Sequence, residues 1–217
     1  EPNENARKYI EPVNLYASCE IKAIVVKGEV KSEVSSAEYH DAEYPNIVKV
    51  GDIITANVIN NCEENLPMIF KVTSVYPFNV EMVNKEDYVE GWDNAHDVSG
   101  ALEIPAVVKA NGVEFNVKAL GANSLASCVN MTSLKLNEGL VSIGPQAIRW
   151  CSKIKEIVVP NSVKEVWGAF LTEDHGLETV VLGTSLETVY TDAFWGVSMN
   201  LKSIFSLNPV PPTCILP

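Results

Sequence analysis

The residues able to do chemistry are few and scattered along the chain. None of the three histidines, His40, His96 and His175, has a second histidine at a metal-ligand spacing. His96 belongs to the segment Trp92-Asp93-Asn94-Ala95-His96-Asp97, whose oxygens could bind calcium, but the spacing of an EF-hand loop is missing. A solvated turn is the simpler interpretation of this segment, and an exposed side chain is the simpler one for His175. The histidines therefore predict no metal site.

The five cysteines also give no clear site, because their number is odd and no C-x-x-C spacing occurs. Cys128 and Cys151 are separated by one period of the repeat described below, and we expect two buried thiols that fill space as small apolar side chains. A disulfide between them is one alternative, and a disulfide between Cys19 and Cys62 is another. Buried thiols are poor nucleophiles. Since G-x-S-x-G, P-loop and G-x-G-x-x-G motifs are also missing, we expect a protein that is not an enzyme and uses no cofactor.

Composition narrows the class of partner. The chain has 217 residues, of which 47% are hydrophobic and 20% charged, which is typical of a globular protein with a real core. Its net charge of −12 argues against nucleic acid and against an anionic membrane surface, since both attract clustered Lys and Arg. No run of eighteen apolar residues occurs, so we expect no insertion into a membrane.

One motif occurs four times in the chain, and its repeats must position any functional site. Its copies begin at Val117, Leu140, Val163 and Leu186, so the starts are evenly spaced along the chain. A period in the twenties with recurring apolar positions is typical of a leucine-rich-repeat solenoid. We therefore predict a mainly β fold, with a solenoid of about four to five coils and a parallel sheet on one face.

The repeat contains apolar columns that we expect to be buried. One column lies on the side of the coil where we expect a helical turn, and it reads Leu125, Ile148, Phe170 and Phe194. Two further columns, at 134 and 136 and their equivalents, alternate with polar residues, as in a strand with one buried face. The first of these two columns reads Leu134, Ile157, Val180 and Ile204. The third copy deviates, because Leu171-Thr172-Glu173-Asp174-His175-Gly176 replaces the expected Cys-x-x-Leu, and we expect this deviation in a surface turn.

The second copy resembles a known family. Residues 143–162 read IGPQAIRWCSKIKEIVVPNS, which is similar to the BspA-like leucine-rich repeat, I-G-x-x-A-F-x-x-C-x-x-L-x-x-I-x-L-P-x-S-V. The resemblance covers about residues 98–213. Trp167 and Tyr190 depart from it, because they stand where the family has glycine.

The resemblance implies a bacterial protein that is secreted or attached to the cell surface, with an extracellular protein as its partner. We expect an adhesion-type interaction module. The start Glu1-Pro2-Asn3, without methionine, is what removal of a leader from an exported protein would leave. The alternative is a carbohydrate-binding module that uses exposed Trp and Tyr with acidic residues. The tryptophans are compatible with both, since their rings could equally fill gaps on the convex surface.

Three segments follow from the chain in order. Residues 1–64 have strand-like runs that do not repeat with the period of the later motif, and we expect a small β domain with a loose N-terminal lead. Residues 65–97 are expected to cap the first open coil and to connect to the solenoid, because solenoid ends must be sealed. Residues 98–217 form the solenoid.

The strand pattern also predicts a binding face. Between the two buried positions of each strand one residue points outward, and this column reads Lys135, Val158, Val181 and Phe205. Glu103 is its expected continuation in the preceding segment. The neighbouring outward column is polar and includes Glu156. An apolar stripe exposed to solvent marks an interaction site. We expect Val158, Val181 and Phe205, with Glu156 and Lys135, to dock the partner, although β-branched residues also suit strands for their own sake.

Overall fold

The computed structural model describes residues 19–27, 30–39, 48–63, 65–190, 192–197 and 200–215. The chain divides into two compact units, Glu1–Val48 and Lys49–Pro217. The strand that follows Val48 is hydrogen-bonded into the sheets of the second unit. The domain limits expected at residues 64 and 97 stay a prediction.

The first unit contains two short antiparallel pairs. Strand β1 (Cys19–Ala23) pairs with β4 (Ser35–Tyr39), and β2 (Val26–Lys27) pairs with β3 (Val30–Lys31). Val25, Val26, Val30 and Val34 are all exposed. Two-stranded pairs of this kind are only marginally stable by themselves.

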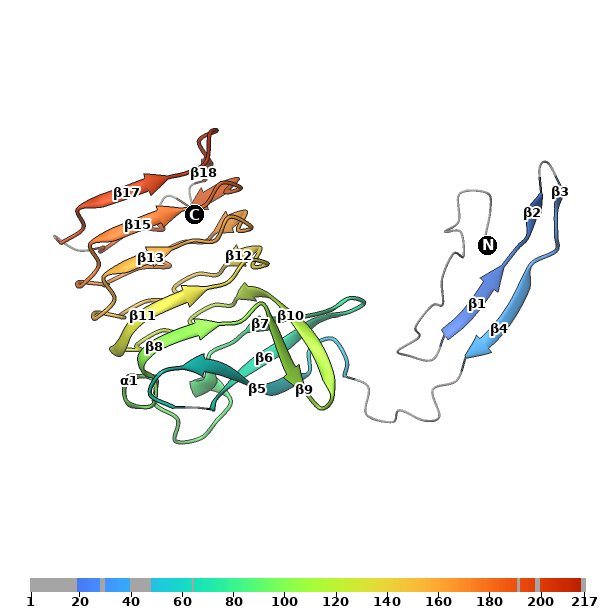
Figure 1. The fold of residues 1–217 in the computed structure, drawn as a ribbon, viewed down its shortest axis with the longest axis horizontal. Helices are drawn as coiled ribbons and strands as arrows, with labels where there is room; N and C mark the ends of the chain where they lie inside the picture. The colour runs from blue at the N-terminus through green and yellow to red at the C-terminus, as the bar shows by residue number, and fades with distance from the viewer. Residues whose placement is uncertain are drawn as a thin grey trace. The chain divides into compact units, whose positions relative to one another are not determined.

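Three antiparallel strands begin the second unit, namely β5 (Ile53–Asn60), β6 (Leu66–Val75) and β7 (Phe78–Met82). Strand β5 alternates between exposed and buried residues, and its inward side chains are Ile54, Ala56 and Val58. The outer strands of this group each continue into the solenoid, since β5 pairs with β8 (Ser99–Ile104) and β7 pairs with β10 (Val113–Leu120). These strands thus supply the first hydrogen-bonding partner to both ladders of the solenoid (Figure 1).

A tight hairpin leads into β10. Strand β9 (Val107–Ala110) pairs antiparallel with β10, and only Asn111 and Gly112 lie between them. Both have positive φ, 51° and 78°. A two-residue Asn-Gly turn with both residues left-handed matches the twist of paired strands, which explains this pair of residues.

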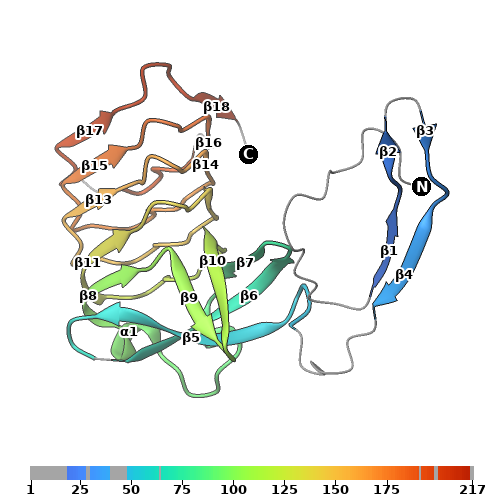
Figure 2. The ribbon, with the colours of Figure 1, turned by 45° about the vertical axis from the view of Figure 1, so that its right-hand side comes forward.

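The coils build two parallel ladders. In the first, β8 pairs with β11 (Asn130–Leu136), and β13 (Glu156–Val158) pairs with β15 (Thr179–Leu182), which pairs with β17 (Ser203–Ser206). Strand β13 lies next to β11, but the regular strand pairing is interrupted between these two strands. The second contains β10, β12 (Ser142–Ile143), β14 (Glu165–Val166), β16 (Thr188–Tyr190) and β18 (Thr213–Ile215). Figure 2 shows the two ladders along different sides of the same coils. The mainly β solenoid predicted from the sequence is confirmed.

The side of the coils between the ladders consists of turns rather than helices. Left-handed backbone recurs there with the period of the repeat, at Ser127, Trp150, Glu173 and Gly196 with φ between 62° and 67°, and at Asn123, Gln146 and Ala169 with φ between 54° and 56°. Two short helical elements lie before the first coil, the 3-10 helix η1 (Lys85–Asp87) and the helix α1 (Asn94–Asp97). Within the described residues, no helix has the length and hydropathy needed to cross a membrane.

The predicted core columns are buried through the first three copies of the repeat. Leu120, Ile143 and Val166 are fully buried, as are Leu125, Ile148 and Phe170. The fourth copy differs. Phe194, expected to be buried, is only half-buried, and Ile204, also expected to be buried, is 47% exposed. Both expectations were wrong for the same reason: these residues lie in the last coil, where the described chain places no further coil over them.

Candidate interaction surface

The outward stripe predicted on the first ladder exists as a geometric feature. Val158 lies opposite Val181, and Val181 lies opposite Phe205, in consecutive parallel pairs. Val158 is 47% exposed and Phe205 is 54% exposed, while Val181 is half-buried between them. Their neighbours Ile157 and Val180 point inward and are fully buried. The alternation of the strands therefore leaves three apolar side chains in a row on the surface.

A polar column runs beside this stripe. Glu156 is opposite Thr179, and Thr179 is opposite Ser203. Glu156 is exposed. The apolar stripe therefore has a hydrogen-bonding border on one side.

A charged pair lies on the neighbouring strands β11 and β8. Lys135 lies opposite Glu103 in the β11–β8 pair, and its Nζ lies 3.0 Å from Glu103 Oε1. The side chain of Asn137 donates to the same carboxylate oxygen, and this hydrogen bond, followed by the one from Lys135, lowers the pKa of Glu103. Lys135 is thus already partnered within the chain.

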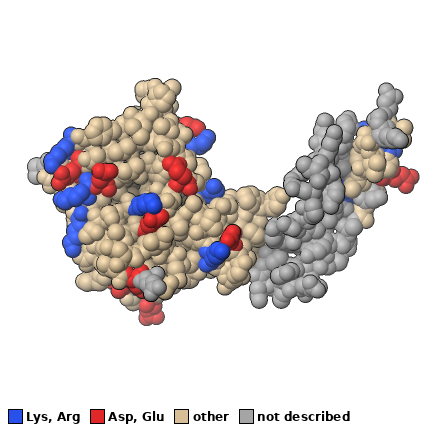
Figure 3. Space-filling view, viewed as in Figure 1, with Lys and Arg blue, Asp and Glu red and all other residues tan. Residues whose placement is uncertain are grey.

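Further charges are paired between coils. Glu178 accepts from Lys202 and lies 3.8 Å from Lys155 Nζ, so one carboxylate bridges three coils. The hydrogen bond from Lys202 is the main reason why the pKa of Glu178 is lowered. Figure 3 shows basic and acidic side chains interspersed along the side of the solenoid that carries the first ladder. Mixed charges around an apolar centre are the usual arrangement at a protein interface.

The second ladder carries an aromatic pair. The rings of Trp167 and Tyr190 stack with centroids 4.6 Å apart and planes inclined by 15°. Trp167 is 37% exposed and Tyr190 is half-buried. Trp150 and Trp195 lie on the turn side and are also exposed, and the guanidinium of Arg149 lies 4.0 Å from the centre of the Trp150 ring. Trp150, Trp167 and Trp195 thus all lie at the surface of the coils.

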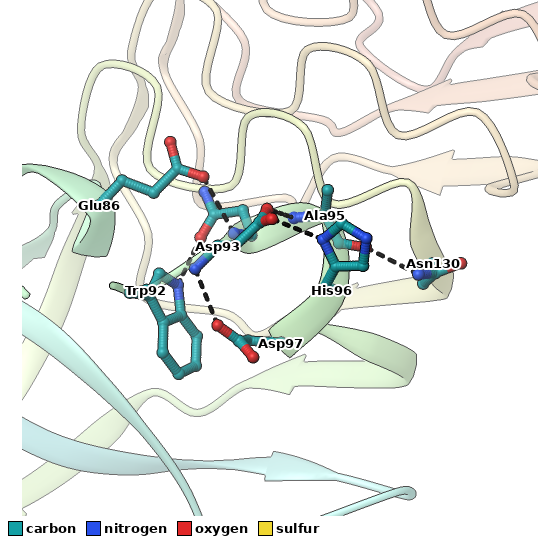
Figure 4. A network of polar contacts seen from close by, with 8 residues as sticks. Glu86, Trp92, Asp93, Ala95, His96, Asp97 and Asn130 are labelled. Atoms are coloured by element: carbon teal, nitrogen blue, oxygen red, sulfur yellow. Dashed lines mark hydrogen bonds and ion pairs between the residues drawn. The ribbon is translucent and has the colours of Figure 1, made fainter. Parts of the chain in front are cut away.

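The segment 92–97 forms a docked helix. Asp93 caps α1 by accepting from the Ala95 N–H, and its other oxygen lies 2.5 Å from His96 Nδ1 (Figure 4). These hydrogen bonds, the one with His96 first, lower the pKa of Asp93. Asp97 accepts from the Asp93 N–H. In the part of the chain that the structure describes, no three His, Cys, Asp or Glu residues are grouped to hold a metal ion.

Two asparagines attach this helix to the first coil. Asn94 is fully buried, and its Nδ2 donates to the Ala126 carbonyl at 2.8 Å. Asn130 Nδ2 donates to the Ala95 carbonyl at 2.7 Å. Nearby, Lys85 is buried against the Trp92 ring, and burial lowers its pKa. The polar residues of this segment therefore serve the fold.

A buried column holds two thiols and a carboxyl group. Cys128 and Cys151 are free and fully buried, and Cys62 is free and exposed. The side chain of Cys19 lies outside the described residues, so the Cys19–Cys62 alternative does too. A hydrogen bond with Cys128, followed by burial, raises the pKa of Cys151.

Asp174 is a buried residue that the sequence analysis missed. Its Oδ1 accepts from the Cys151 N–H, and its Oδ2, among the described residues, has no hydrogen-bond partner. Burial raises the pKa of Asp174 to about 8, against the opposing effect of the Cys151 hydrogen bond. The segment 171–176 was expected to be a surface turn. The signal that could have found Asp174 was its position one period after Cys151, which places it in the cysteine column.

Several solved structures resemble this chain. A leucine-rich repeat protein from Bacteroides capillosus is 18% identical, with a TM-score of 0.47, over 64% of this chain and 93% of that one. A leucine rich cell surface protein from Faecalibacterium prausnitzii is 16% identical, with a TM-score of 0.42, over 69% of this chain and 41% of that one. The pneumococcal vaccine antigen PcpA is 16% identical, with a TM-score of 0.40, over 68% of this chain and 42% of that one. The match to the last two spans about two fifths of their length. No curated protein matches the chain in sequence.

The repeats themselves match a family model. Residues 109–208 match the BspA type leucine rich repeat region, in six copies. This stretch contains the outward stripe of the first ladder and the aromatic pair of the second. With the regular period of the sequence and the stacked parallel ladders, the match shows that residues 109–208 belong to the BspA type of leucine-rich repeat.

Proposed function

We propose that this chain is a protein-interaction module, without enzymatic activity, that docks an extracellular protein on the first ladder. The observation that carries the proposal is the row of Val158, Val181 and Phe205, which point outward in register from three consecutive strands. Apolar side chains in a row on a surface lose contact with water when a partner covers them.

The chemistry of this surface favours a protein partner. Phe205 offers a large exposed ring at one end of the row, and aromatic residues carry much of the energy of protein interfaces. The ion pairs Lys135–Glu103 and Lys202–Glu178 leave little unpaired charge beside the stripe. Such a surface is suited to an apolar patch with a polar rim on the partner. Glu156 and Lys135 would lie at that rim.

The family resemblance also supports a location outside the cell. We propose that the module is exposed on the bacterial surface or released from it. Protease treatment of intact cells that produce the protein should remove an epitope tag placed between residues 110 and 113. Protection of that tag until the cells are lysed would contradict the proposed location.

The docking surface can be tested with a matched pair of variants. The triple variant V158S/V181T/F205S removes the stripe, and V50T/V107T/V141S removes three exposed apolar side chains elsewhere. A partner is first identified among extracellular proteins by photo-crosslinking from position 205, and its affinity for the purified chain is then measured. We expect the stripe variant to lose at least about tenfold in affinity, equivalent to about 1.4 kcal/mol, and the control variant to lose less than twofold. Unchanged affinity in a stripe variant with the native circular dichroism spectrum would refute the assignment.

A further inference from the structure

The second ladder carries a feature that protein docking on the first ladder does not use. In the first four strands of this ladder, the residue that follows the buried position forms an outward column, which reads Gly121, Gly144, Trp167 and Tyr190. The hydrogen bonds of the ladder continue through it, since Gly144 N–H donates to the Leu120 carbonyl at 2.8 Å and Trp167 N–H to the Ile143 carbonyl at 2.9 Å. The column therefore has glycine in its first two coils and an aromatic residue in the next two.

The stacking leaves one face of the indole without a neighbour from its own column. Tyr190 covers the face of Trp167 on the side of the fourth coil, at 4.6 Å between centroids. On the other side stands Gly144, and a Cβ there would lie only 2.9 Å from the Gly121 backbone. Close stacking of the first two coils thus requires glycine at this position. The Trp167 indole therefore presents one flat face toward the backbone at Gly144. This face is called the aromatic shelf below.

Polar groups lie beside the shelf in a second outward column. Ser142 is opposite Glu165, Glu165 is opposite Thr188, and Thr188 is opposite Thr213. Ser142, Glu165 and Thr188 are half-buried. Throughout the described ranges, no hydrogen bond or ion pair is formed by the side chains of these three residues. By contrast, the lysine next to Glu165, Lys164, is paired with Glu187 at 2.9 Å.

The arrangement distinguishes between classes of small ligand. Cations are held best where several aromatic faces enclose them. Here the second ring lies parallel to the first, with an angle of 15°, so the pair offers a single platform rather than a cage. An anion would face the carboxylate of Glu165. A ring with an apolar face and a rim of hydroxyl groups fits best, because it can stack on the indole while its hydroxyls reach the carboxylate and the two hydroxyl side chains.

We propose that Trp167, with Glu165 and Thr188, forms a binding site for a neutral saccharide on the second ladder. The sugar stacks on the free face of the indole over Gly144, and Glu165 accepts hydrogen bonds from its hydroxyl groups. The site does not depend on the stripe of the first ladder, so either proposal can fail while the other holds.

The test is a titration of the whole chain with defined probes. Cellohexaose, xylohexaose, mannohexaose and chitohexaose are added up to 5 mM, and binding is followed by isothermal titration calorimetry and by indole fluorescence. We expect at least one of these neutral saccharides to bind. Trp167→Gly restores the residue that its column has in the first two coils, so it keeps the backbone and removes the shelf. It should weaken binding at least about tenfold, and Glu165→Gln about threefold or more.

Controls separate the proposed site from binding elsewhere on the chain. Trp195→Ala removes a more exposed tryptophan, 66% accessible, on the turn side and should leave saccharide affinity unchanged. Tetramethylammonium chloride is the cationic probe. The proposal is overturned if none of the four saccharides binds, if Trp167→Gly folds and keeps full affinity, or if only tetramethylammonium binds and Glu165→Gln abolishes that binding.

Discussion

The first and the last described coils of the solenoid are covered to different extents. At the N-terminal end, β5 and β7 hydrogen-bond to the first strand of each ladder, and side chains such as Phe70 and Met82 are fully buried beneath them. At the C-terminal end, β17 and β18 are the last strands of their ladders in the described chain, and Ile204, Leu207 and Val210 are exposed.

This difference shows that the position of a coil in the stack decides whether its apolar residues are buried. Leu134, Ile157, Val180 and Ile204 occupy one column of the repeat, and the first three are buried. Residue type is nearly constant along the column, yet exposure changes sharply at the last coil. Each coil of a solenoid contacts only its neighbours, so a residue with a neighbour on one side keeps about half of its cover.

The largest effect should come from removing the covered end. We expect residues 49–217 to fold cooperatively and residues 98–217 to fail to do so, because the shorter fragment loses β5, β6 and β7 and exposes the first coil. Each large core side chain contributes about 2–5 kcal/mol, so the loss exceeds the roughly 5–15 kcal/mol by which a domain is stable. Thermal unfolding by circular dichroism and light scattering measure both fragments.

A third fragment sharpens this experiment. Residues 65–217 lack only β5, and we expect intermediate stability, because β8 then loses its antiparallel partner while β10 keeps β7. Equal melting temperature and equal solubility of 98–217 and 49–217 would show that residues 49–97 do not cap the solenoid.

Two phenylalanines of one column test the comparison directly. Phe170 is fully buried, whereas Phe194, one coil later, is half-buried and touches Phe170 edge to face at 5.7 Å. We expect Phe170→Ala to lower the free energy of unfolding by about 3–5 kcal/mol, and Phe194→Ala by about 1–2 kcal/mol, because less contact is lost. Urea titration measures both. A cost for Phe194→Ala equal to that for Phe170→Ala would mean that the last coil is covered in solution.

The buried carboxyl group of Asp174 should make the stability of the solenoid interior depend on pH. Its pKa is raised from 3.8 to about 8 in the folded chain, so above pH 4 the unfolded chain releases a proton that the folded chain retains. Stability should therefore fall as pH rises from about 4 to about 8, by at most about 6 kcal/mol, and level off above that. Asp174→Asn keeps an oxygen for the Cys151 N–H and cannot ionise, so we expect it to be about 1–3 kcal/mol more stable than the parent at pH 8.

Urea titrations of the Asp174→Asn variant and the parent at pH 4.5, 6 and 8 measure this effect. The two proteins should be closest in stability at pH 4.5. A stability difference that does not change with pH would show that Asp174 does not titrate between these values.

The smallest effect concerns a turn that the coils share. Ser127 in the first coil and Gly196 in the last have nearly the same left-handed φ, 65° and 67°. That conformation costs a residue with a Cβ about 1 kcal/mol. We expect Ser127→Gly to stabilise the chain by about 0.5–1 kcal/mol and Gly196→Ala to destabilise it by a similar amount. Chemical denaturation of both variants would reveal a different turn geometry if the two changes had the same sign.

The sequence by itself determined the repeat and most of its columns. The regular spacing of the four copies predicts stacked coils, and alternation within each strand predicts which residues point outward, because both follow from local geometry. That is why Val158, Val181 and Phe205 could be placed in one row before their pairing was seen. Their role in binding stays a prediction.

Only the tertiary structure decided which strands cover the first coil and which residues of the last described coil are buried. Strand β5 belongs to the solenoid because it pairs with β8, about forty residues later in the chain, and no local pattern encodes such a pairing. The exposure of Ile204, the burial of Asp174 and the stacking of Trp167 on Tyr190 likewise depend on the neighbouring coil. A periodic sequence states what each coil contains, but burial, pKa and ring contacts are properties of two coils in contact.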